Sequence, residues 1–158
     1  MSITLARIDP DRFTDWTALH ALIMDAFAYM DGRIDPPSSA HRLTPENLKD
    51  KADVETAILA MENGALLGCV FCKPEPETLY IGKFAISPKA QGKGIGRLLL
   101  AAAEARAREL GLSALRLETR IELTDNHAVF GKWGFVKTAE NAHAGYDRPT
   151  SIEMKKAL

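Results

Sequence analysis

Apolar and polar residues alternate over Ile3–Ile8, and this period of two predicts a β-strand. Three further apolar segments are interpreted as successive strands: Glu55–Glu62, Ala65–Lys73 and Thr78–Ile86. Asn63-Gly64, between the first two of these, is the dipeptide most typical of a two-residue hairpin turn. The first half of the chain is therefore expected to contain antiparallel hairpins.

Apolar residues recur at helical spacing over Asp11–Tyr29, which predicts an amphipathic helix. Thr44 followed by Pro45 combines an N-cap hydroxyl with proline at the first helical position, and predicts a short helix there. A longer helix is expected over Gly94–Leu110, because Gly111 supplies a typical C-terminal stop. Its buried stripe is predicted to be Leu98, Ala101, Ala102, Ala105 and Leu110.

The second half of the chain mixes strands and short helices. Strands are expected over Ala114–Thr119, Phe135–Thr138 and Ser151–Lys155, with a short helix over Asp125–Lys132. The strand–helix–strand unit that begins at Thr78 implies a parallel pair with a right-handed crossover. Combined with the early hairpins, it predicts a mixed sheet of the α/β class. The length suits one domain over residues 1–158.

A glycine-rich loop, residues 91–96 (Gln-Gly-Lys-Gly-Ile-Gly), stands between a predicted strand and the long helix. Alternate glycines let the backbone approach a ligand, and the N–H groups of a helix start bind anions such as phosphate. A P-loop is excluded, since Lys93 is followed by glycine rather than Ser or Thr, and Ser87 takes the upstream glycine position. The dinucleotide fingerprint is excluded because position 97 is arginine.

The pattern that fits is Q-x-x-G-x-G, formed by Gln91, Gly94 and Gly96. Between a strand followed by Ser-Pro and a long helix, it resembles the acetyl-CoA loop of the GCN5-related N-acetyltransferase (GNAT) family. A second segment, Asn126–Phe135, is similar to the family's later helix-turn-strand, which commonly ends in Gly-Phe. The resemblance covers Leu79–Val136 well and the rest loosely. It implies a mostly antiparallel twisted sheet with a central, splayed parallel pair and flanking helices.

The resemblance also implies where acetyl-CoA would bind as a co-substrate. Its pantetheine arm would lie between the splayed strands and pair with the backbone of the first. The loop N–H groups would bind the pyrophosphate, and a side chain on Gly94 or Gly96 would stand between backbone and phosphate. The implied cofactor-binding residues are Phe84, Ala85, Ile86, Gln91, Gly92, Lys93, Gly94, Ile95, Gly96, Arg97, Asn126 and Phe130.

The implied reaction is direct attack of an amine on the thioester, which requires a base for the amine. Glu118 is the first candidate, since it lies near the carboxyl end of a parallel strand, although its alternating charged neighbours also suit a solvated charge ladder. Lys83 is a poor base unless it is buried. The family often has a tyrosine four residues before the glycine of Gly-Phe, as the acid for the thiol, but this chain has Phe130. Tyr146 and His127 are possible substitutes.

Two long loops, residues 29–42 and 141–150, carry aromatic and charged side chains suited to ligand contacts. The predicted acceptor contacts are Tyr29, Arg33, Asp35 and Tyr146. Their mixed charges suit a small polar amine, such as an amino acid or a polyamine, without selecting one. A peptide N-terminus or a lysine side chain stays open.

Net charge and hydropathy limit the classes of partner that the chain is expected to bind. The net charge is −1, and no apolar run reaches the length of a membrane span, so neither a nucleic acid nor a membrane is an expected partner. No signal-peptide core precedes the first strand, which predicts a cytoplasmic location. Cys69 and Cys72 lie three apart on a predicted strand and so point to opposite faces, which argues against a redox or metal pair. The histidine spacings predict no metal site.

The sequence therefore predicts an N-acyltransferase that uses acetyl-CoA. Two alternatives remain. One is a non-catalytic acyl-CoA-binding sensor, which the phenylalanine at position 130 favours. The other is an acyltransferase that acts on a protein. A homodimer is expected by analogy alone, since small folds of this kind often associate through late strands.

Overall fold

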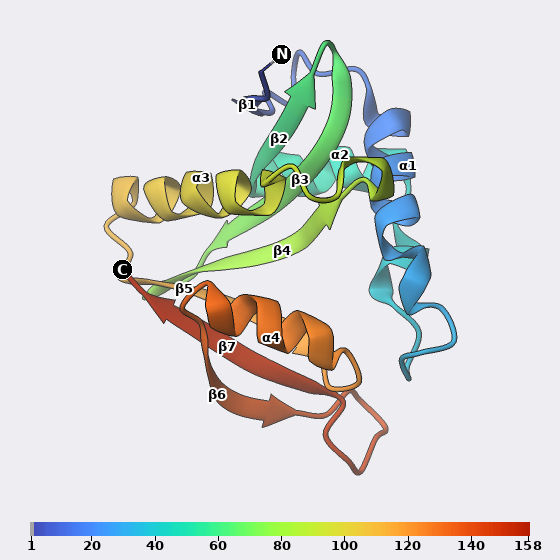
Figure 1. Cartoon of the computed structure of the whole chain (residues 1–158), viewed down its shortest axis with the longest axis vertical. Helices are drawn as coiled ribbons and strands as arrows, with labels where there is room; N and C mark the ends of the chain where they lie inside the picture. The colour runs from blue at the N-terminus through green and yellow to red at the C-terminus, as the bar shows by residue number, and fades with distance from the viewer. Residues whose placement is uncertain (1) are drawn as a thin grey trace.

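The computed structural model describes residues 2–158, whose strands form a seven-stranded sheet in the order β1-β2-β3-β4-β5-β7-β6 (Figure 1). Neighbouring strands are antiparallel except for the parallel pair β4 and β5. The predicted mixed, mostly antiparallel sheet is therefore confirmed. The strands are β1 (Thr4–Arg7), β2 (Thr56–Glu62), β3 (Ala65–Pro74), β4 (Thr78–Ile86), β5 (Ala114–Arg120), β6 (Val136–Asn141) and β7 (Ser151–Ala157).

The helices flank this sheet, and local signals define several of their ends. Thr44 caps α2: its hydroxyl accepts from the Asn47 N–H at 3.1 Å while the Asn47 side chain accepts from the Thr44 N–H at 2.8 Å. The predicted Asn63-Gly64 turn is also confirmed, with φ values of 53° and 79°. The helices are α1 (Trp16–Phe27), α2 (Pro45–Val54), α3 (Ile95–Glu109) and α4 (Thr124–Lys132), with short 3₁₀ turns η1 (Ala28–Met30), η2 (Ser39–Arg42) and η3 (Pro88–Ala90).

The sheet separates two apolar clusters. The α3 face holds the buried side of α3 with Leu115 and Leu117 of β5, and the α1/α2 face holds α1 and α2 with Phe71 of β3. Cys72 belongs to the first cluster and Cys69 to the second, which confirms that the two thiols point to opposite faces. Burial raises the pKa of each thiol to about 12, so both stay protonated and unreactive.

The predicted buried stripe of α3 was wrong: of its five members only Ala102 packs, partly buried, against the core. Leu98 is 40% exposed, whereas Leu99 and Ala103 are fully buried. The stripe that packs on the sheet contains Ile95, Gly96, Leu99, Leu100, Ala103 and Ala107. Gly68 of β3 allows this approach, since a Cβ there would lie 3.0 Å from the Ile95 side chain. Among the described residues, no helix is long and apolar enough to cross a membrane.

Candidate functional site

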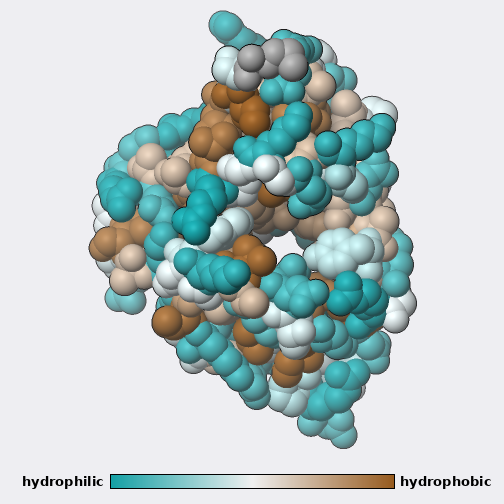
Figure 2. All heavy atoms as spheres, in the orientation of Figure 1, coloured by the Kyte–Doolittle hydropathy of each residue, from teal (hydrophilic) through white to brown (hydrophobic). Residues whose placement is uncertain are grey.

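The parallel strands β4 and β5 separate after a short contact. They pair only from Thr78 with Ala114 to Tyr80 with Arg116, and their later residues diverge (Figure 1). A cavity of about 720 Å³ lies between them, lined by both strands, the start of α3, one side of α4 and the segment between α1 and α2. Figure 2 shows an opening between the two halves of the molecule. A volume of this size suits a large ligand that passes between the strands.

A β-bulge in β4 shapes the centre of the cavity. Cys69 and Phe71 of β3 are two residues apart, but their partners on β4, Ala85 and Gly82, are three apart. Lys83 adopts a positive φ of 47° at this extra position. A bulge bends a strand away from its neighbour. The edge of β4 that faces the gap has no partner from β5 beyond Tyr80 in the described ladder, so it can pair with an extended ligand.

The glycine loop forms the N-terminal end of α3. Gly94 is the N-cap residue with a φ of 75°, and Gly92 has a φ of 82°. No side chain caps this end, so the first N–H groups of α3 are available to an anion. A Cβ on either glycine would meet nothing within 4 Å, so this side of the loop is open. The loop therefore fits a diphosphate group.

Gly96 is required for a reason other than the predicted one. A Cβ on Gly96 would lie 2.8 Å from the Trp133 ring and 3.2 Å from Ile86. Any side chain at position 96 is therefore excluded by Trp133, whereas position 94 is open. The centre of the Trp133 ring lies 5.8 Å from the centre of the Phe84 ring. The Arg97 guanidinium carbon lies over the same indole, 5.9 Å from the ring centre. Sequence reasoning missed Trp133, although it lies in the quoted segment three residues after Phe130.

Most of the predicted cofactor residues meet in the cavity. Two do not line it: Ala85 is buried in the α1/α2 cluster, and the Lys93 amine lies 3.4 Å from a Glu62 carboxylate oxygen. The residues that line it are Phe84, Ile86, Gln91, Gly92, Gly94, Ile95, Gly96, Arg97, Asn126 and Phe130.

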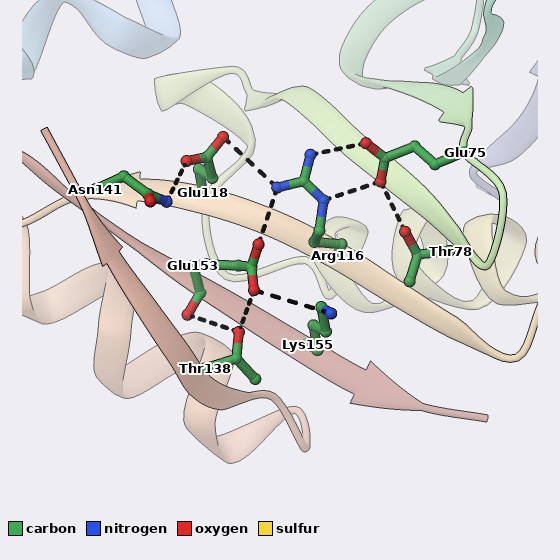
Figure 3. Close-up of polar contacts among 8 residues, drawn as sticks. All are labelled: Glu75, Thr78, Arg116, Glu118, Thr138, Asn141, Glu153 and Lys155. Atoms are coloured by element: carbon green, nitrogen blue, oxygen red, sulfur yellow. Dashed lines mark hydrogen bonds and ion pairs between the residues drawn. The ribbon is translucent and has the colours of Figure 1, made fainter. Parts of the chain in front are cut away.

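Glu118 lines the cavity from β5 and is held by two partners (Figure 3). Its Oε1 accepts a hydrogen bond from the Asn141 side chain at 3.0 Å, and its Oε2 lies 3.7 Å from the Arg116 guanidinium. Arg116 also binds Glu75 at 2.8 Å and Glu153 at 3.2 Å. The Arg116 charge is therefore shared among three carboxylates, and the position of Glu118 is fixed.

The predicted acceptor residues divide into two groups. Tyr29 lines the cavity, where its hydroxyl accepts from the Asn126 side chain at 2.9 Å. Asp35 lies outside the lining, where it accepts from the Tyr146 hydroxyl at 2.6 Å and binds Arg148 at 3.0 Å. This bond raises the pKa of Tyr146. Arg33 also lies outside the lining and packs over the Tyr29 ring.

His143 lines the cavity and has the features of a base. Its backbone N–H donates to the Thr150 hydroxyl at 2.9 Å, and its Nδ1 contacts the same hydroxyl. Because that hydroxyl can donate to the Asn141 carbonyl, the arrangement favours a protonated Nδ1 and a lone pair on Nε2. Burial, and then Arg120, lower the pKa of His143, which favours the neutral ring. His127 lies outside the lining, with its Nε2 2.9 Å from the Arg120 carbonyl.

Lys83 projects from the bulge into the cavity wall, where its amine donates to the Ser39 hydroxyl at 2.8 Å. Burial above all, together with the positive charges of Lys51, Arg42 and Arg120, lowers the pKa of Lys83 from 10.5 to about 8. Glu55 opposes them. Lys83 is thus partly desolvated, which the sequence could not show.

We expect Lys83→Met to stabilise the fold at pH 7 by about 1–3 kcal/mol, since one pKa unit corresponds to about 1.4 kcal/mol. The pKa of Lys83 is lower in the folded chain than in the unfolded one. Between about pH 8 and 10.5, the unfolded chain therefore holds more protons than the folded chain does. The wild type gains stability over that interval, and the advantage of the variant shrinks. Urea unfolding at pH 7 and pH 10 measures both, with Lys49→Met on the exposed side of α2 as control. Equal stabilities at pH 7 would contradict the prediction.

The chain matches known proteins along most of its length. Residues 16–135 match the acetyltransferase (GNAT) family. An IAA acetyltransferase of Azospirillum brasilense is 33% identical over 159 residues, which cover 99% of each chain. An aminoglycoside N(6')-acetyltransferase type 1 of Stenotrophomonas maltophilia is 40% identical over 53 residues, 34% of this chain and 35% of that protein.

Among solved structures, the PaiA N-acetyltransferase of Thermoplasma acidophilum in complex with coenzyme A matches over 100% of both chains, with a TM-score of 0.80 and 17% identity. This likeness supports the fold seen in the sheet order and the splayed strands. The glycine loop, the gap beside β4 and the family match agree. The chain belongs to the GNAT family of acetyltransferases, whose co-substrate is acetyl-CoA.

Proposed function

We propose that this protein transfers an acetyl group from acetyl-CoA to a primary amine of a small polar molecule. The observation that carries the proposal is that one cavity offers different chemistry at its two ends. The α3 face offers the phosphate-binding loop, and the α1/α2 face offers polar and charged side chains that include Glu118. A thioester in the gap beside β4 would stand between them.

In the proposed step, Glu118 accepts a proton from the ammonium form of the acceptor, whose neutral nitrogen then attacks the thioester carbonyl and loses its second proton to solvent as the amide forms. A nitrogen–carbon bond forms, the carbon–sulfur bond breaks, and coenzyme A leaves as a thiolate. A backbone N–H near Ala85 or Ile86 would stabilise the oxyanion. Solvent protonates the thiolate in this proposal, since Phe130 has no proton to give and the Tyr146 hydroxyl is bonded to Asp35.

The state of the protein in the cell is also part of the proposal. Residues 1–158 would form a single cytoplasmic domain. A homodimer would form through β6, which is an edge strand and exposes Val136 by 63%. Sedimentation at micromolar concentration tests the dimer, and a monomer would refute it.

The decisive experiment is thiol release from acetyl-CoA with a panel of amines: amino acids, polyamines, aminoglycosides and a lysine peptide. We expect release with small amines and little with the peptide. Release with the peptide alone would favour a protein acetyltransferase. Tight acetyl-CoA binding with no release from any amine would favour the non-catalytic sensor, the reading that Phe130 supports.

A further inference from the structure

Among the described residues, two cations that line the α1/α2 side of the cavity have no carboxylate within ion-pair distance. Lys83 comes from the bulge of β4 and Arg120 from the last position of β5, so they approach the gap from its two sides. Within residues 2–158, neither has a carboxylate oxygen within 4.0 Å. Lys83 donates to a hydroxyl, and the Arg120 guanidinium donates to the carbonyls of Pro36 and Pro37 at 2.5 and 3.0 Å.

Two other cations close to the gap, Lys51 and Arg116, are compensated by carboxylates. Lys51 binds Glu55 at 2.7 Å, and the Arg116 charge is shared among three carboxylates. Arg97 stands beside Trp133 at the glycine loop. Among the described residues that line the acceptor side, the cations without an ion pair are therefore Lys83 and Arg120, and Glu122 and Asp35 act on Arg120 only from beyond ion-pair distance.

This charge lies away from the phosphate loop. Lys83 bonds to Ser39 of η2, and Arg120 bonds to the segment just before η2, so both face the α1/α2 side of the sheet. The glycine loop opens at the start of α3, which packs on the opposite face. An anion between Lys83 and Arg120 would therefore belong to the acceptor rather than to the diphosphate of coenzyme A.

The same side of the cavity has an apolar wall, to which Phe27, Met30 and Ile34 contribute. We propose that the acceptor is a small amine with a carboxylate and an apolar side chain, such as an apolar α-amino acid, whose carboxylate binds between Lys83 and Arg120. The amine would then face Glu118, the acidic side chain of the lining. This inference rests on the proposed function. Polycationic amines would meet two unpaired positive charges and are disfavoured.

The test compares phenylalanine, leucine and methionine with their primary amides, and adds spermidine and kanamycin. Thiol release gives kcat/KM for each. Calorimetric titration of protein saturated with coenzyme A measures binding of phenylalanine or phenylalaninamide, with no turnover required. The amides keep the side chain and the amine but lack the anion. Lys83→Gln removes one cation, and Lys49→Gln is the control from the exposed side of α2.

We expect at least a tenfold preference for the amino acid over its amide in the wild type and in Lys49→Gln, and a preference reduced several-fold in Lys83→Gln, which keeps Arg120; an unchanged preference in Lys83→Gln would overturn the inference. Equal use or binding of the amide, or better use of spermidine or kanamycin, would overturn the inference while leaving the transferase intact. If no amine releases thiol, the proposed function fails, and binding alone decides: a preference for phenylalanine supports the carboxylate site, and no binding overturns it.

Discussion

Gly94→Asp is expected to weaken acetyl-CoA binding by at least about 100-fold, because two like charges placed side by side cost several kcal/mol. Gly94 is the N-cap of α3, and its open side faces away from the protein. A carboxylate there would stand where the diphosphate meets the helix N–H groups. Calorimetric titration with acetyl-CoA measures the loss.

Two variants separate charge from strain. Gly94→Asn has the same size and the same tolerance of a positive φ as aspartate, but no charge, and we expect it to lose about tenfold or less. Gly111→Asp places a carboxylate at a φ of 72° at the opposite end of α3, where no atom lies within 4 Å of the new Cβ, and it should bind normally. Wild-type affinity in Gly94→Asp would remove the phosphate-loop interpretation.

The glycine loop could be predicted because its signal is local. Alternate glycines between a strand and a helix need no tertiary information, and the structure places Gly92 and Gly94 at positive φ as the pattern requires. The Thr44 cap and the Asn63-Gly64 turn are equally local. Each depends on backbone geometry within a few residues, which the sequence specifies directly.

The stripe of α3 could not be predicted because its sequence is apolar on several sides. Leu98, Leu99 and Leu100 are consecutive, so helical periodicity allows more than one buried face. The choice is made by β3, where Gly68 leaves room for Ile95. The partner surface therefore decides the phase of the helix.

The residues at the acceptor end of the cavity could be brought together only once the order of the strands in the sheet was known. Lys83 and Arg120 are 37 positions apart in sequence. The bulge in β4 and the separation of β4 from β5 bring both side chains to the same cavity. Glu118 meets Asn141 because β7 lies between β5 and β6, with Glu118 opposite Glu153. Strand order and register are long-range properties, so these neighbours could not be predicted from local pattern.

Desolvation of Lys83 points to a role in binding. Burial of a lysine without a carboxylate costs stability, and this is the source of its lowered pKa. A residue that serves the fold alone would be replaced by an uncharged one at a gain in stability. The expected stabilisation by Lys83→Met and the expected reduction of carboxylate selectivity are thus two consequences of one feature.

Glu118→Gln is expected to lower kcat at neutral pH by about 100-fold or more, the range typical of a lost general base. Glutamine keeps the shape and can still accept from Asn141, but it cannot take a proton. Acetyl-CoA affinity should stay within about twofold, because the carboxylate lies on the acceptor side. The rate of thiol release measures kcat, and calorimetric titration measures the affinity for acetyl-CoA.

The matched control is Glu153→Gln, which removes a carboxylate from the same Arg116 cluster (Figure 3) but does not line the cavity. If the cluster acts only as a structural charge network, both variants should behave alike, with similar changes in stability and rate. If Glu118 is the base, Glu118→Gln alone loses turnover and its dependence on pH changes. His143→Gln completes the comparison: a wild-type rate in Glu118→Gln with loss in His143→Gln would transfer the role to the imidazole, whose Nε2 the Thr150 contact leaves able to accept a proton.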